Sequence, residues 1–252
     1  MKVVNHMKKQ SKGFTLVELL VVIGILGILM GVLFPTIASA MQTAKTNACA
    51  IQGRKLFQEI TQADISREQK GMVSIWPRGS QTKSDDTDDI SGTVYSSSYE
   101  YFQKLFDLDN YGKEEWDPYV GCDLSVLSGF GVTPYSGSGT LKGDNVIWCV
   151  AQGIETDLPE VLPVLISRNA CTEDFVKSGT FQGTEQTKIK VGKDNGAESS
   201  VPFGSKVYVI VRKGGASEVV ESKYSKQYLV YKHQGFTIPS DSDFDYLKTG
   251  CN

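Results

Sequence analysis

The sequence predicts an α+β protein, in which one long N-terminal helix packs against a small antiparallel β-sheet. Two observations predict this fold class. An apolar run near the N-terminus continues into a stripe of apolar residues at helical spacing, and strand-like runs between glycine-rich stretches fill the second half of the chain. We therefore expect a long helix over residues 14–70 and a globular head over residues 71–252.

The first half of the expected helix is apolar on all sides. Leu19 to Phe34 is a run of sixteen residues without a charged or polar side chain. As a helix, the segment from Phe14 to Phe34 is about 31 Å long, close to the thickness of the hydrocarbon core of a bilayer. The sequence therefore predicts a membrane-spanning segment at about residues 14–36.

Beyond Pro35 the helix is expected to become amphipathic. Pro35 has no amide hydrogen, so it predicts a kink or a loosened turn after Gly31. Gly71 and Pro77 end the helical pattern. The apolar stripe consists of Ile37, Met41, Ala44, Ala48, Ile51, Leu56, Ile60 and Ala63.

Three glycines share one face of the apolar segment, because Gly24, Gly27 and Gly31 lie at spacings of three and four. Small residues in such a row allow helices to approach closely in a membrane or a filament. Glycine is also simply tolerated in membrane helices, so both interpretations stay open.

The head is expected to contain a short helix and several strands. Ser97 and Glu100 have the spacing of a capping box in front of an aromatic-rich helical pattern. The pair Gly214-Gly215 between two β-branched runs predicts a hairpin. The strand-like runs are Asn145–Val150, Val161–Ser167, Thr187–Val191 and Val207–Arg212, the last followed by Glu218–Val220.

Charge and motif content argue against two classes of function. The formal charge is 26 − 29 = −3 for the whole chain, and without residues 1–13 it is 22 − 29 = −7. An acidic protein is poorly suited to general nucleic-acid binding, which uses Lys and Arg against phosphates. Beyond residue 13 the only histidine is His233, and no nucleotide-binding or hydrolase motif is present, so we expect no enzyme.

Glu18 is the one acid in the apolar segment. A carboxylate there costs on the order of a few kcal/mol unless it is protonated or paired with a cation. The nearest cation is Lys12, just outside the run, so the surrounding chain offers no partner. A cut after Gly13 would place a new amino group on Phe14, one helical turn from Glu18. In a stack of such helices, this amine could meet the acid of a neighbouring subunit.

The segment Gly13-Phe14-Thr15-Leu16-Val17-Glu18, followed by Leu19–Ile23, resembles the prepilin-peptidase signature of type IV pilins and type II secretion pseudopilins. The resemblance covers residues 8 to about 70. It implies that residues 1–13 are a leader removed after Gly13, that Phe14 becomes N-methylated and that Glu18 is the assembly acid. Pro35 occupies the place of a helix-kinking proline found in many members of this family.

This resemblance implies a structural subunit of a secretion pseudopilus or pilus-like fibre. Its implied partners are a prepilin peptidase, an inner-membrane assembly platform, membrane lipid, copies of the chain and other pseudopilins.

The charge distribution predicts how the chain crosses the membrane. The leader carries no acid, and it has four lysines if it begins at Met1 or three if it begins at Met7. The first cation beyond the apolar run is Lys45, so the N-terminus is expected in the cytoplasm and the head outside. We therefore expect a single-pass inner-membrane protein with a periplasmic head, which enters a filament in the periplasm or outside the cell.

A secretory signal peptide is the alternative interpretation. Basic residues precede the apolar core, and Pro35 and the A-x-A sequence Ala38-Ser39-Ala40 follow it. Cleavage after Ala40 would release a chain beginning at Met41, for example a module that binds an extracellular polysaccharide. The sixteen-residue core exceeds the usual ~7–15 residues, and a signal peptide has no use for Glu18, so the pilin-like interpretation is favoured.

The cysteines predict one or two disulfides, with buried thiols as the alternative, because the head is expected in an oxidising compartment. Cys49 belongs to the long helix. No pair has the Cys-x-x-Cys spacing of a redox or zinc site. The disulfide candidates in the head are Cys122, Cys149, Cys171 and Cys251, and they allow three connectivities. The resemblance adds that pilins often close a C-terminal loop with a disulfide, for which Cys251 is suitably placed.

One weak metal signal lies near the C-terminus. Asp241, Asp243 and Asp245 alternate as in the opening of a calcium-binding loop, but Tyr246 stands where such a loop needs glycine. The major pseudopilins bind calcium near their C-terminus, and this resemblance makes calcium the candidate ion. A solvated acidic loop is the alternative, as it is for residues 85–89. No other cofactor is expected.

Overall fold

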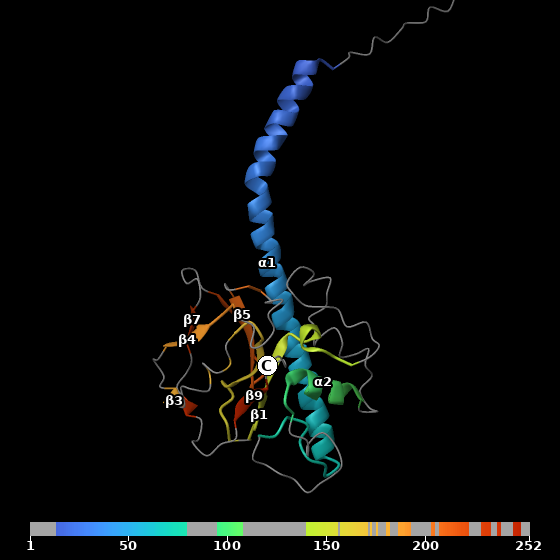
Figure 1. Cartoon of the computed structure of the whole chain (residues 1–252), viewed down its shortest axis with the longest axis vertical. Helices are drawn as coiled ribbons and strands as arrows, with labels where there is room; N and C mark the ends of the chain where they lie inside the picture. The colour runs from blue at the N-terminus through green and yellow to red at the C-terminus, as the bar shows by residue number, and fades with distance from the viewer. Residues whose placement is uncertain are drawn as a thin grey trace, which may run out of the picture. The chain divides into compact units, whose positions relative to one another are not determined.

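A computed structural model describes residues 14–79, 95–107, 140–155, 157–170, 172, 175, 180–181, 186–192, 203–204, 207–221, 228–232, 236–237 and 244–247. The helices are α1 (Leu16–Glu68), α2 (Ser98–Asp107) and the short 3-10 helix η2 (Gly143–Asn145) (Figure 1). The strands are β1 (Trp148–Gln152), β2 (Pro163–Ser167), β3 (Thr180–Phe181), β4 (Gln186–Lys190), β5 (Val207–Arg212), β6 (Ser217–Glu221), β7 (Tyr228–Lys232), β8 (Phe236–Thr237) and β9 (Asp245–Leu247).

The predicted α+β class is confirmed. The main sheet has five antiparallel strands in the order β6-β5-β2-β1-β9. In its central ladder Cys149 of β1 lies opposite Ile166 of β2, and Val150 lies opposite Leu247 of β9 on the other side. The pairs β3-β8 and β4-β7 form two small two-stranded sheets.

The strand predicted from Asn145 begins later in the structure. Gly143–Asn145 form η2, in which the Asn145 side-chain oxygen accepts a hydrogen bond from the Lys142 amide at 2.8 Å. This local turn competes with extended backbone, so β1 starts at Trp148.

The hairpin predicted at Gly214-Gly215 joins β5 to β6. Gly215 has a φ of +79°, which L side chains rarely adopt, so glycine is required in this turn. The Lys213 Nζ anchors the turn, because it donates to the carbonyls of Glu155 at 2.7 Å and Leu158 at 2.6 Å. Burial lowers the pKa of Lys213 from its ordinary value, while the charges of nearby acidic side chains oppose this shift.

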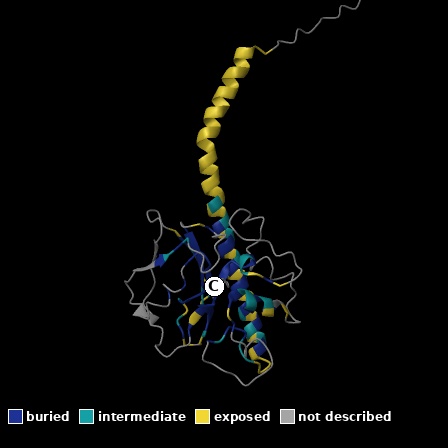
Figure 2. Cartoon of the chain, in the orientation of Figure 1, coloured by how far each residue is buried: buried dark blue, intermediate teal, exposed yellow. Residues whose placement is uncertain are grey.

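The second half of α1 packs on the sheet and belongs to a compact unit that comprises residues 44–252. Cys49, Leu56 and Ile60 are fully buried on one helical face (Figure 2). At Gly53 the helix approaches β1 so closely that an added Cβ would lie 2.5 Å from the Trp148 ring. Of the predicted amphipathic stripe, only Leu56, Ile60 and Ala63 build the core. The earlier members Ile37, Met41 and Ile51 are exposed, so the buried face begins later than predicted and follows a different register through Cys49 and Gly53.

The predicted helix after Ser97 is α2. Its Glu100 amide donates to the Ser97 hydroxyl at 3.4 Å, whereas the Glu100 carboxylate accepts from the Ser96 amide at 3.0 Å, so the capping contacts are shared between two serines. The buried Ser98 hydroxyl donates to the Leu247 carbonyl at 2.7 Å and accepts from the Val150 amide at 3.1 Å. These two bonds join the start of α2 to β9 and β1.

Candidate processing and assembly site

The candidate site begins at the N-terminus of α1, where Thr15 and Glu18 cap the helix reciprocally. The Glu18 amide donates to the Thr15 hydroxyl oxygen at 3.3 Å. In return, the Glu18 Oε2 accepts from the Thr15 amide at 2.9 Å and from the Thr15 hydroxyl at 2.8 Å. This is a capping box, in which two amides that cannot bond within the helix find side-chain partners.

The surrounding chain therefore does offer Glu18 hydrogen-bond donors, which the expectation of a positively charged partner overlooked. The Thr-x-x-Glu spacing was present in the sequence as a capping-box signal and would have indicated Thr15. The box supplies hydrogen bonds but no positive charge, so it reduces the desolvation cost of the carboxylate without neutralising it. Within the described residues only Oε2 of Glu18 is engaged, which leaves Oε1 able to accept a further donor.

The first half of α1 is exposed to solvent along its whole length in the part of the chain that the structure describes. Every described residue from Phe14 to Met41 is exposed (Figure 2). Phe14 itself is 84% exposed. By length and composition α1 is able to cross a membrane. A surface of large aliphatic side chains on this scale is stable only against lipid or against other apolar surfaces.

Gly24, Gly27 and Gly31 form an open strip on this helix. A Cβ added at any of the three would have no atom within 4 Å. Within the described part of the chain nothing fills the strip, so it is available to a partner helix. The helix continues through Pro35, after which the Thr36 hydroxyl donates to the Leu33 carbonyl at 2.7 Å.

The cysteines depart from the prediction in two respects. Cys49 of α1 is disulfide-bonded, although the candidates were all sought in the head. Cys149 carries a buried thiol outside any disulfide, which corrects its inclusion among the candidates. As the second residue of β1 it packs as a small apolar side chain between the fully buried Trp148 and Val150. Cys122, Cys171 and Cys251 lie outside the described residues, so their pairing stays a prediction.

The calcium site also stays a prediction. Asp241 and Asp243 lie outside the described residues, as do residues 85–89 and His233. Asp245 begins β9 opposite Gln152, and its carboxylate accepts from the Tyr246 amide at 2.8 Å. Among the residues that the structure describes, no three His, Cys, Asp or Glu side chains form a metal-binding group.

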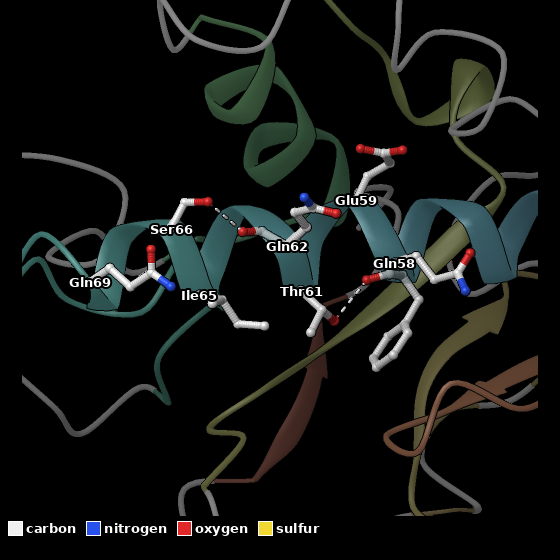
Figure 3. A pocket seen from close by; sticks show the side chains of 8 residues that line it. Gln58, Glu59, Thr61, Gln62, Ile65, Ser66 and Gln69 are labelled. Carbon is white, nitrogen blue, oxygen red and sulfur yellow. Dashed lines mark hydrogen bonds between the residues drawn. The ribbon is translucent and has the colours of Figure 1, made fainter.

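An open pocket of about 630 Å³ lies along the second half of α1 (Figure 3). Its hydroxyl groups are already used by the helix, because Thr61 donates to the Phe57 carbonyl at 2.8 Å and Ser66 to the Gln62 carbonyl at 2.9 Å. The described lining offers amide groups and one acid, but no nucleophile next to a base. It consists of Phe57, Gln58, Glu59, Thr61, Gln62, Ile65, Ser66 and Gln69.

Comparison with known proteins identifies the N-terminal segment only. Residues 8–34 match a family model described as a prokaryotic N-terminal methylation motif. The match includes Gly13, which lies outside the described residues, together with Phe14, the capping box and the glycine strip. No curated protein and no solved structure matches the chain.

Proposed function

We propose that this chain, which carries a prokaryotic N-terminal methylation motif over residues 8–34, is a type IV pilin-like structural subunit and not an enzyme. A prepilin peptidase removes residues 1–13, and the new N-terminus at Phe14 is methylated. Before assembly, the mature subunit is anchored in the inner membrane with its head in the periplasm. An assembly platform then adds it to a type II secretion pseudopilus or a type IV pilus-like fibre, beside copies of itself and other pseudopilins.

The observation that carries this proposal is the acid at the start of an uncovered helix. Glu18 caps α1 through one oxygen and retains a second oxygen that no described donor uses. Removal of residues 1–13 gives each subunit a positively charged amino group on Phe14. The amino group of one subunit can then bind the second carboxylate oxygen of Glu18 in a neighbouring subunit. Pairing the two charges removes the main cost of keeping a carboxylate in an apolar bundle.

The pair also provides register. Apolar helices can slide along one another, because their contacts are non-directional. An amine and a carboxylate separated by one helical turn set a single axial offset between neighbours. The glycine strip supports the same packing, since small residues let the helix axes approach.

The disulfide of Cys49 supports the proposed orientation. Disulfides form and persist in oxidising compartments such as the periplasm, and they are rare in the cytosol. Cys49 follows the apolar run, and all four lysines of residues 1–13 precede it. Redox chemistry and the positive-inside rule therefore agree on which end of α1 faces outward.

Replacement of Gly13 tests the processing step. A bulky Leu at this position is expected to block the cut, so Gly13→Leu should remain a full-length precursor in the membrane. Intact-mass and N-terminal analysis would measure this, with methylated Phe14 expected in the native protein. Ser11→Leu, which adds the same side chain two residues earlier, is the matched control and should mature. Normal maturation of Gly13→Leu would contradict the proposal.

A further inference from the structure

A second cleavage signal lies on the other side of the apolar run. Ala38 and Ala40 place small side chains at the first and third positions before the Ala40–Met41 bond, and Pro35 lies five residues before Ala40. Together with the apolar run, these are the parts that a signal-peptidase-type enzyme reads. The pilin-like function gives a role to Pro35 but none to Ala38 or Ala40.

The depth of this bond suits such an enzyme. If Phe14 to Phe34 spans the hydrocarbon core, the bond lies about 9 Å further along the helix. That position corresponds to the outer headgroup layer, where a membrane-bound peptidase can reach the chain while the apolar segment stays inserted.

The helix around the bond is continuous, but several side chains compete for its backbone carbonyls. A protease needs an extended segment, and three hydroxyls here bond back to helix carbonyls, which competes with regular helix geometry. These bonds run from Thr36 to Leu33 at 2.7 Å, from Ser39 to Thr36 at 2.9 Å and from Thr43 to Ser39 at 3.2 Å. No side chain between residues 36 and 41 is buried, so opening this turn sacrifices no core packing.

The cut would leave the head intact. The compact unit begins at Ala44, and the first buried side chain of α1 is Thr46. Every cysteine of the chain lies after residue 40, so both sulfur atoms of the Cys49 disulfide stay on the released fragment. Nothing covalent then holds the fragment to the membrane segment.

We propose that a signal-peptidase-type membrane enzyme hydrolyses the Ala40–Met41 bond of part of the chain population and releases residues 41–252 as a soluble head. Water adds to the Ala40 carbonyl, the peptide bond breaks, and the Met41 nitrogen leaves as an amine. The apolar segment remains in the membrane with a new carboxylate on Ala40. The same chain thus has two fates, an anchored subunit and a released head, set by which peptidase acts.

The test separates the two pools of the full-length protein after expression in a bacterium with both peptidases. N-terminal sequencing of the soluble periplasmic and medium fraction should identify a head that begins at Met41. Ala40→Leu should abolish this species, because a bulky side chain replaces the small one next to the bond. Ser39→Leu, which changes the unrestricted middle position, is the matched control and should still be released.

Each outcome decides the matter. Absence of any chain beginning at Met41, or release unchanged in Ala40→Leu, overturns the proposal. The membrane pool is sequenced in parallel, so failure of the pilin-like function is read separately. A membrane pool without methylated Phe14 contradicts that function, whereas a soluble pool beginning at Met41 supports the release.

Discussion

Glu18 has two roles at the scale of a single residue, and they depend on different properties of its side chain. Its oxygen atoms cap α1 through Thr15, which any hydrogen-bond acceptor could do. Its charge is needed only if an amine from a neighbouring subunit pairs with it. A substitution that keeps the acceptor and removes the charge separates the two roles.

Glu18→Gln is this substitution, because glutamine also serves in capping boxes. We expect the variant to be cleaved after Gly13 and to stay in the membrane, yet to form no filaments. Filament yield after shearing and sedimentation is the measurement. Thr15→Val, which removes the hydroxyl and keeps the acid, is the counterpart and should still assemble. Normal filaments from Glu18→Gln would show that capping alone suffices.

Tyr101 of α2 shows how burial tunes a single group. Its hydroxyl is fully buried and has no hydrogen-bond partner among the residues that the structure describes. Burial raises the pKa of Tyr101 well above its ordinary value, helped by the nearby Tyr95 and Asp64. A raised pKa means that the folded state favours the neutral phenol. The resulting stability is present below the unfolded pKa of about 10 and is lost as the pH rises further.

Tyr101→Phe is therefore expected to stabilise the head by about 1 kcal/mol at neutral pH, because it removes a hydroxyl that has lost its water without gaining a bond. It should also weaken the loss of stability above about pH 10. Urea unfolding across this pH range is the measurement. Tyr246→Phe is the control, because its hydroxyl donates to the Pro163 carbonyl at 2.8 Å and its loss should destabilise the head. A destabilised Tyr101→Phe would contradict the argument.

At the scale of the element, α1 changes character along its length. Its first half needs an external apolar environment, and its second half supplies one wall of the core. The helix packs most closely on the sheet at Gly53, because the lack of a side chain there leaves room for the ring of Trp148. In an exposed helix an alanine would be about 1 kcal/mol better than this glycine.

Gly53→Ala is expected to reverse that preference and destabilise the head by about 1–3 kcal/mol, because the new methyl group would overlap the indole. The overlapping atoms are Cη2 and Cζ2 of Trp148, at 2.5 and 2.6 Å. Thermal unfolding of the purified protein is the measurement. Gln58→Ala, at an exposed site of the same helix, should be nearly neutral. The double variant with Trp148→Phe should recover part of the loss, and a stabilised Gly53→Ala would refute the close approach.

At the scale of the whole molecule, the chain consists of an uncovered apolar segment and a head with its own core. Residues 44–252 form one compact unit that contains the buried face of α1, the sheet and α2. Its core brings together residues distant in sequence, such as Leu56, Val150 and Leu247. The head therefore does not depend on the apolar segment before Ala44 for its hydrophobic burial.

A fragment that begins at Ala44 is expected to be soluble and folded, with the Cys49 disulfide formed after periplasmic export. Size-exclusion chromatography, circular dichroism and the mass change on reduction would measure this. The full-length protein should instead sediment with the membrane and resist carbonate extraction. Aggregation of the fragment would show that the apolar half of α1 contributes to the stability of the head.

Most of the secondary structure could be predicted because its signals are local. The apolar run, the helical stripe and the β-branched runs of β2, β5 and β6 each depend on neighbouring residues. β9 was missed because its three residues include the acid Asp245, and only the pairing with β1 makes them a strand. A strand that forms only because a neighbouring strand pairs with it cannot be recognised from its own residues.

The sequence by itself determined the fold class and an apolar segment long enough to span a membrane, since both follow from composition and spacing along the chain. It also carried the methylation motif, through its resemblance to a known signature. Only the tertiary structure decided that Cys49 and not Cys149 is disulfide-bonded, and that Gly53 must lack a side chain. Disulfides and close packing depend on distances between segments far apart in sequence. Those distances exist only after the helix has docked on the sheet.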